Sequence, residues 1–509
     1  LLWLGVIPAV QAQTFDKLWK QVEQAEKKSL PQTVIKLTGE IYQKGEAEKN
    51  SPQMLKAYMW RMKYRDMLTP DSLYTNVKEL EQWAKQADKP MDRAILHSLI
   101  AGIYANYAAN NQWQLRQRTE IVGEVPSADM REWTANMFVE KVRTSIKEAM
   151  ADSVLLLNTS SRTYIPFVEL GETSEYYHHD MYHLLAFRSI EALQQVEGLD
   201  RATPVEAYSE DTSSKKQSPV KQDIERIYEN MLTSYKAKGD KEGCLLTNLN
   251  YLSWKRDSSK SFREPFSVKK GGTYMMTVDP YETGLDALKT EYKSSDLCAE
   301  VYLAQANYMI GKEQQTVALQ LCDEAIRLYP GYRRINALKN LREDILSPSL
   351  NVTAAATAFP GEEIKIRASH KNLDGFTLRL FQAKKLIKEQ HFAVLRPEDY
   401  RTQDTVFTFQ APEVGEYVMR IIPDIRAKRD SESKFNVTRF KALTCRLPGN
   451  QYEVVTLDGQ TGHPISNAKV TMYSNDEKVL QEFTTDKDGK VVFPWKSEYR
   501  YLKASKGTD

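Results

Sequence analysis

The spacing of apolar residues changes near residue 348, and this change most constrains how the chain can fold. From Thr14 to about Leu346, apolar residues recur three and four positions apart, which is the period of an amphipathic helix. After Ser347-Pro348-Ser349 they alternate with polar residues, which is the period of a half-buried strand. At 509 residues the chain is also too long for a single hydrophobic core. The sequence therefore predicts a multidomain protein that is helical first and β second.

The segment 13–348 is predicted to form an irregular α-solenoid. Before Pro330, small and large residues fall where a tetratricopeptide repeat places the side chains through which its two helices pack; they are Tyr302, Ala306, Ala318, Cys322 and Ala325. The earlier helices do not keep this register, so we expect an irregular stack. The polar segment 200–223, which contains Ser clusters and Pro, is predicted to be a flexible loop between helices.

Two antiparallel β-sandwiches are predicted, over residues 349–444 and 445–509. In the first, strands recur at intervals of roughly ten residues, as in a sandwich of ~100 residues. The dipeptides Pro360-Gly361 and Asp374-Gly375 supply turns between these strands. In the second, Asp488-Gly489 is a hairpin signal. The second segment is short for a sandwich, so an incomplete sandwich is an open alternative there.

Residues 1–12 have the features of the end of a secretory signal peptide. The first nine residues form a short apolar block, and Val10-Gln11-Ala12 supplies the small residues of a cleavage site before Gln13. We therefore expect an exported protein, with a buried helix start as the alternative. No Cys stands at the cleavage site, so a lipid anchor is not expected.

Charge and cysteine content exclude several classes of protein. The net charge of +2, from 70 basic and 68 acidic residues, gives no overall field that would attract nucleic acid. No apolar run reaches the ~20 residues of a membrane span. The four cysteines are too few for a fold held by disulfides; they are Cys244, Cys298, Cys322 and Cys445. We expect all four to be small buried side chains, and a Cys298–Cys322 disulfide is the alternative.

One cluster of residues could hold a metal ion. Glu175, His179 and His183 are four residues apart, and on a helix they would share one face, as a Zn²⁺ set would require. The motif is not His-Glu-x-x-His, so the general base of a metalloprotease is missing, and a polar aromatic patch is the favoured interpretation. No nucleophile elbow, P-loop or dinucleotide-binding turn appears. We therefore predict no catalytic, cofactor-binding or metal-binding residues and no enzymatic activity; a metal-dependent hydrolase using His179 and His183 is the minor alternative.

Two sets of motifs follow each other in the β half. The first comprises the Pro-Gly-Glu turn at 360–362, Asn372, the strand 378–381, and the closing segments 415–418 and 435–438. The second comprises Thr-Gly-x-Pro at 461–464, continuing to Val470, and Thr-Asp-x-x-Gly at 485–489. In this order they resemble the macroglobulin-like domains of the bacterial alpha-2-macroglobulin family, over roughly residues 349–509. The second set alone also fits a generic extracellular β-module.

The resemblance implies the N-terminal part of an endopeptidase inhibitor that traps proteases in the periplasm or cell envelope of a Gram-negative bacterium. The β domains would form the cage wall, the solenoid would be a docking surface, and target proteases would be the partners. The family's thioester motif, Cys-x-Glu-Gln, is absent, because the partial match at 298–301 ends in Val301. The alternative is an envelope scaffold for protein–protein interactions that is unrelated to proteases.

Overall fold

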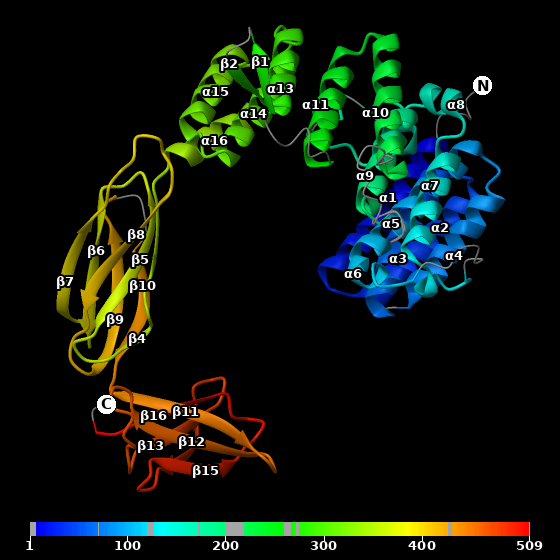
Figure 1. Cartoon of the computed structure of the whole chain (residues 1–509). Helices are drawn as coiled ribbons and strands as arrows, with labels where there is room; N and C mark the ends of the chain where they lie inside the picture. The colour runs from blue at the N-terminus through cyan, green and yellow to red at the C-terminus, as the bar shows by residue number, and fades with distance from the viewer. Residues whose placement is uncertain are drawn as a thin grey trace. The chain divides into compact units, whose positions relative to one another are not determined.

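A computed structural model describes residues 7–69, 71–119, 127–171, 174–176, 178–199, 218–258, 266–270, 274–425, 430–507 and 509. Helices come first and mainly antiparallel sheets follow, as the change in periodicity predicts (Figure 1). The chain divides into two compact units, Leu1–Leu297 and Cys298–Asp509. Of the segment predicted to be a signal peptide remnant, residues 7–12 begin the first helix and residues 1–6 lie outside the described part of the chain.

The first unit consists mostly of helices that pack against their neighbours in the chain. They are α1 (Ile7–Lys27), α2 (Pro31–Ala47), α3 (Ser51–Leu68), α4 (Ser72–Gln86), α5 (Pro90–Asn110), α6 (Gln112–Leu115), α7 (Ala135–Ala149), α8 (Ser153–Asn158), α9 (Met181–Val196), α10 (Pro219–Lys238), α11 (Lys241–Ser258) and α13 (Pro280–Glu291), with short 3-10 turns η1 (Met130–Glu132) and η2 (Ser161–Tyr164). Proline begins several of them, because its fixed φ and missing N–H suit the first helical position. Helix α5 packs against α4, α7 and α9, so it lies at the centre of this unit.

Two features of this unit differ from the sequence prediction. Helix α10 begins at Pro219, inside the segment 200–223 predicted to be a loop, because the Ser218 side chain accepts a hydrogen bond from the Lys221 N–H and caps the helix. Residues 200–217 of that segment lie outside the described residues. Strands β1 (Phe266–Lys270) and β2 (Tyr274–Val278) form an antiparallel hairpin where the helical spacing of the segment 13–348 lapses, and no strands were predicted there.

The second unit begins with α14 (Ala299–Gly311), α15 (Gln315–Leu328) and α16 (Ile335–Leu346), after the 3-10 turn η5 (Asp296–Cys298). Helices α14 and α15 pack against each other. The residues expected at a close helix contact are all buried, namely Tyr302, Ala306, Ala318, Cys322 and Ala325. Small side chains at such positions let two helices approach closely. Helix α16 ends at Leu346, and the first strand of the β half begins at Ser349.

The β region of this unit has two parts. The first, called the first β half, spans residues 349–437 and has two sheets that enclose one core. Its strands are β3 (Ser349–Thr353), β4 (Thr357–Ala358), β5 (Glu363–Lys371), β6 (Gly375–Gln382), β7 (Lys385–Ala393), β8 (Gln403–Gln410), β9 (Gly415–Pro423) and β10 (Ser431–Val437). One sheet has the order β3-β5-β8 and the other the order β4-β10-β9-β6-β7. Alternate residues of β5 are buried in the core, as period-two patterning predicts. The short β4–β10 pair is parallel, so this part is not wholly antiparallel.

The second part, called the second β half, spans residues 440–505. It also has two sheets, and its core is less completely covered than that of the first β half. Its strands are β11 (Phe440–Leu447), β12 (Gln451–Asp458), β13 (Lys469–Tyr473), β14 (Val479–Thr484), β15 (Lys490–Pro494) and β16 (Tyr501–Ser505). The sheets have the orders β11-β12-β15 and β14-β13-β16. Val454, Met472 and Phe493 are buried in the core, but Leu502 and Ala504 of β16 are only partly buried. Strand β11 begins at Phe440, before the predicted boundary at 445.

Candidate functional site

The structure does not place Glu175, His179 and His183 on one helix. Helix α9 begins at Met181, because Oδ1 of Asp180 accepts a hydrogen bond from the His183 N–H at 2.9 Å and caps the helix. The expectation of a shared helical face was therefore wrong. Within the described ranges, no group of three or more His, Cys, Asp or Glu side chains is arranged to hold a metal ion.

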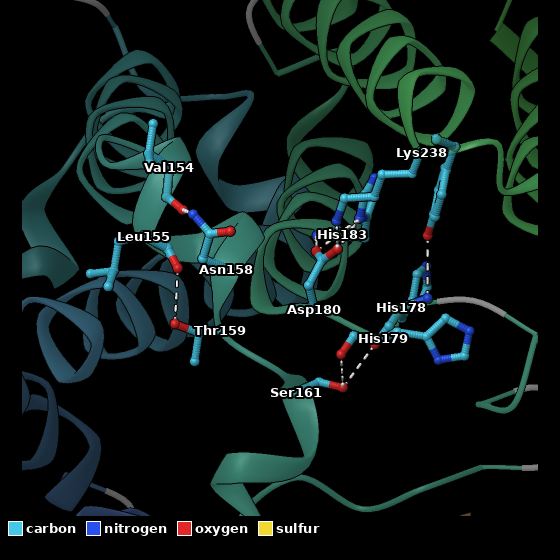
Figure 2. A network of polar contacts seen from close by, with 11 residues as sticks. Val154, Leu155, Asn158, Thr159, Ser161, His178, His179, Asp180, His183 and Lys238 are labelled. Carbon is cyan, nitrogen blue, oxygen red and sulfur yellow. Dashed lines mark hydrogen bonds and ion pairs between the residues drawn. The ribbon is translucent and has the colours of Figure 1, made fainter.

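Asp180, His183 and Lys238 instead form a polar cluster, in which Asp180 and His183 are buried and Lys238 is exposed (Figure 2). Nδ1 of His183 lies 2.8 Å from Oδ1 of Asp180, and Nζ of Lys238 lies 2.6 Å from Oδ2. The imidazole of His183 is fully buried and stacks on the ring of Tyr235, with 3.7 Å between the ring centroids. Burial of Asp180 disfavours its charged form, but hydrogen bonds from His183 and Lys238 outweigh that effect and lower the pKa of Asp180 to about 2.

The segment before α9 is attached to the same cluster. Oγ of Ser161 contacts the carbonyl oxygens of His178 and His179 at 2.9 and 3.1 Å, and the hydroxyl of Tyr235 accepts a hydrogen bond from the His178 N–H (Figure 2). Burial, followed by the neighbouring His183, lowers the pKa of His178 to about 3. Because the His183 ring is fully buried, a substrate has no access to it. The cluster therefore joins α9, α10 and η2 and does not have the form of a reaction centre.

The cysteines form no disulfide bond among the described residues. Cys244, Cys298 and Cys322 are buried, as predicted, and burial raises the pKa of the Cys322 thiol to about 11. A thiol with a raised pKa is a poor nucleophile at neutral pH. Cys445 is exposed, which contradicts the prediction that all four cysteines are buried. It lies on β11, at the edge of the sheet β11-β12-β15, where residues on both faces remain accessible.

The partial thioester motif at 298–301 is part of the helix packing. Cys298 is fully buried just before α14. The Glu300 carboxylate is also buried, and it accepts hydrogen bonds from the Tyr332 hydroxyl and the Arg334 guanidinium. A buried carboxylate needs such partners to offset the loss of its hydration. Both residues therefore have structural roles in this motif.

The first unit carries a hollow of about 830 Å³ that no sequence motif indicated. Helices α3, α5 and α9 supply most of its walls. Its polar lining is rich in side-chain amides, which are Asn106, Asn110, Asn111, Gln194 and Gln195. Its apolar lining includes Met59, Met62, Leu99 and Ile103. A second hollow of about 720 Å³ also reaches Glu191 and Gln194, so the exposed face of α9 separates the two.

The motif residues of the first β half shape a turn and close the core. Gly361 has a φ of +70°, which glycine adopts at little steric cost, so the turn after Pro360 requires it. Phe435 and Val437 of β10 are buried in the core. The N–H of Thr438 donates to the Ala358 carbonyl at 3.0 Å, continuing the pairing with β4. This motif therefore defines a structural module and supplies no reactive group.

The motif residues of the second β half have similar roles. Gly489 has a φ of +70° at the hairpin turn. The hydroxyls of Thr456 and Thr485 are buried and both donate to the Ile465 carbonyl, at 2.7 and 3.1 Å. Oδ1 of Asp458 accepts a hydrogen bond from the Thr461 N–H at 2.8 Å and fixes the turn before β13. These contacts explain why the motif has this spacing.

No protein-family model and no curated protein matches the chain. Two solved structures that resemble it are fragments of native alpha-2-macroglobulin from Escherichia coli. The fragment spanning domains MG0-NIE-MG1 is 15% identical, with a TM-score of 0.27, and the match covers 31% of this chain and 62% of that chain. The fragment spanning NIE-MG1 is 15% identical, with a TM-score of 0.25 and coverages of 32% and 94%. TM-scores this low do not establish a shared fold.

Proposed function

We propose that the chain is a non-enzymatic, exported N-terminal part of an alpha-2-macroglobulin-like endopeptidase inhibitor. In this proposal the two β halves are macroglobulin-like sandwiches in the wall of a cage that traps proteases. The helical region is a tetratricopeptide-like solenoid that docks a partner. The protein acts in the periplasm or cell envelope of a Gram-negative bacterium, and target proteases are its partners.

The observation that supports this proposal most is the succession of two motif-bearing modules without a linker. Strand β10 ends at Val437 and β11 begins at Phe440. The two residues between them are held in place, because Oγ1 of Thr438 accepts a hydrogen bond from the Phe440 N–H at 2.9 Å and the Arg439 carbonyl accepts one from the Gly459 N–H at 2.8 Å. A junction without a free linker suits the wall of a cage, because neighbouring domains in such a wall must stay in contact.

The two modules also repeat one strand arrangement. The sheet β3-β5-β8 of the first corresponds in order to β11-β12-β15 of the second, and β7-β6-β9 corresponds to β14-β13-β16. The two-sheet sandwich is the architecture of many cell-surface domains. The non-enzymatic assignment is further supported by the closed Asp180–His183 cluster and the buried Cys298.

The size of the native protein tests the proposal. An antibody raised against this chain is used to probe envelope fractions of the host. If the chain is the N-terminal part of a protease trap, the exported band should be several-fold larger than the 58.5 kDa of this chain. A band near 58.5 kDa would instead support the envelope scaffold. A band that stays in the cytoplasmic fraction would contradict export.

A further inference from the structure

Strand β10 of the first β half has one edge that is paired only near its end. Along the other edge, β10 pairs with β9 from Ser431 to Val437. Along this edge, β4 pairs with Asn436 and Val437 alone. The chain before β4 does not continue the pairing, because residues 354–356 cross over from β3, which belongs to the opposite sheet. Within the described ranges, β10 therefore has no partner strand on this edge at residues 431–435.

The alternation of backbone groups identifies those that the open edge presents. The Asn436 N–H donates to the Ala356 carbonyl at 2.9 Å, so it points away from β9. In an antiparallel pair, successive residues direct their N–H and C=O groups to opposite sides. The N–H and C=O groups of Glu432 and Lys434 therefore point the same way, and no hydrogen bond from the described part of the chain reaches them. Unpaired groups at this spacing are a template for one more strand.

A pocket of about 280 Å³ lies beside this open edge. Its lining combines residues 431–435 of β10 with Leu350 and Val352 of β3 and with residues 354–356. Leu350 and Val352 pack against the core but are only partly buried. A volume of this size admits single side chains but not a helix, which is ~10 Å wide. The pocket can therefore receive the side chains of a strand that is added to β10.

The core is incompletely covered at this end of β10. Alternation places Ser433 on the same face as the buried Phe435 and opposite the buried Met419, yet Ser433 is exposed. On β8, the edge strand of the other sheet, Phe407 and Phe409 pack against the core themselves. The core beside Ser433 therefore lacks the apolar side chains that β8 supplies at its own edge.

The two charged residues that line the pocket direct their side chains away from the core. Glu432 and Lys434 alternate with the core-facing residues of β10, and both are exposed. Nε of Arg420 on β9 lies 2.6 Å from the Glu432 carboxylate on that outer face. These charges therefore do not oppose apolar side chains on the core face of an added strand, and they suit polar side chains at its alternate, outer positions.

We propose that the edge of β10 at residues 431–435 binds an extended segment of a partner polypeptide as an added β-strand. The backbone of this segment pairs with Glu432 and Lys434. Apolar side chains at every second position enter the pocket and pack on Leu350 and Val352. In such a complex, main-chain hydrogen bonds supply affinity and the pocket supplies specificity. The inference concerns the first β half alone and does not rest on the proposed protease trap.

Phage-displayed random dodecapeptides are the probe, and Lys434→Pro is the decisive variant. Proline removes the N–H that faces the open edge but leaves the pairing with β9 intact, as proline on an edge strand does. The library is first depleted on the immobilised Lys434→Pro chain and then selected on the wild-type chain. The enriched sequences should carry apolar residues at alternate positions. By fluorescence anisotropy, Lys434→Pro should raise the Kd of one labelled peptide at least tenfold, equivalent to ~1.4 kcal/mol.

Two matched controls separate the backbone from the side chain and from proline itself. Lys434→Ala keeps the N–H and should leave the Kd unchanged. Thr408→Pro places proline at an exposed position of β8, whose N–H also points away from its partner strand, and Thr408 does not line the pocket. It should leave the Kd unchanged as well. Circular dichroism should show that all three variants are folded, and hydrogen exchange should show that the peptide slows exchange at residues 431–437.

Several results would overturn the inference. They are no enrichment on the wild-type chain, a consensus without alternating apolar residues, a loss of binding by Lys434→Ala equal to that of Lys434→Pro, and unchanged exchange at residues 431–437. A wild-type chain that sediments as a dimer without peptide, and as a monomer once Lys434→Pro is introduced, would identify a second copy as the occupant and would also overturn it.

Discussion

Nδ2 of Asn372 donates a hydrogen bond to the carbonyl oxygen of Leu346 at 2.9 Å and so ties the first β half to the last turn of α16. The same Nδ2 lies 2.9 Å from the Ile345 carbonyl, and Asn372 adopts a φ of +55°. The last carbonyls of a helix have no partner within the helix, so a buried amide satisfies them. Asn372 therefore makes the junction between helix and sheet a specific contact.

Asn372→Ala should lower the free energy of unfolding of this unit. The variant leaves helix-end carbonyls without their buried partner, which costs about 1–3 kcal/mol, and Ala at a φ of +55° adds backbone strain. Chemical denaturation of the whole chain, followed by circular dichroism, measures the change. The control is Asn307→Ala, which removes an exposed contact to the Leu303 carbonyl and should change stability by less than about 0.5 kcal/mol. Equal effects of the two substitutions would mean that Asn372 does not stabilise the junction.

Asp180→Asn should destabilise the helical unit at neutral pH and have little effect in strong acid. The folded-state pKa of Asp180 is lowered to about 2, whereas an unfolded Asp has a pKa near ~3.9. The ionised carboxylate therefore contributes stability above pH ~4, and this contribution is lost as the pH falls through about 2. Urea unfolding of the wild type and the variant, between pH 6 and pH 2, should show a difference that shrinks toward acid. Asp71→Asn, at an exposed position, is the control, and a constant difference for Asp180→Asn would refute the assignment.

Cys445 should be the first cysteine to react with a thiol reagent in the native protein. It is exposed on β11, whereas the other three cysteines are buried. The raised pKa of Cys322, about 11, further slows its reaction. Brief treatment with iodoacetamide followed by peptide mass spectrometry should find modification at Cys445 alone. Modification of Cys298 or Cys322 at a similar rate would show that the α14–α15 contact opens in solution.

Backbone amides of β16 should exchange with solvent faster than those of β9. Strand β9 lies between β6 and β10, and its Tyr417, Met419 and Ile421 are buried. Strand β16 pairs with β13 and is an edge strand of its sheet within the described residues. Its Leu502 is only partly buried. Local opening is easier where fewer contacts cover a strand. Hydrogen exchange measured by mass spectrometry on this 509-residue chain tests this, with the central strand β13 as the protected control. Equal protection of β9 and β16 would contradict it.

The sequence predicted the order of fold classes because hydrophobic periodicity is a local signal. The change after Ser347-Pro348-Ser349 matches the end of α16 at Leu346 and the start of β3 at Ser349. The buried positions Ala306, Ala318 and Cys322 were also predictable, since close helix contacts need small side chains.

Other features depended on competing local effects or on contacts distant in sequence. The spacing of Glu175 and His179 suggested a helix that already includes both residues. Asp180 instead caps α9, so the helix begins only at Met181, because side-chain capping outweighs apparent helical spacing. Cys445 is exposed because its strand lies at a sheet edge, which composition does not reveal. The hollow was not predicted because Gly102 and Asn106 of α5 and Gln195 of α9 come to line one space only after folding.

We propose that the native protein traps proteases, and comparing protease activity on large and small substrates tests this proposal. The protein is purified from its host and incubated with trypsin, and hydrolysis of casein and of a small p-nitroanilide substrate is then followed. A trap predicts that casein hydrolysis falls several-fold while hydrolysis of the small substrate persists, because only the small molecule can enter the cage. Unchanged hydrolysis of both substrates would show that the protein does not trap trypsin.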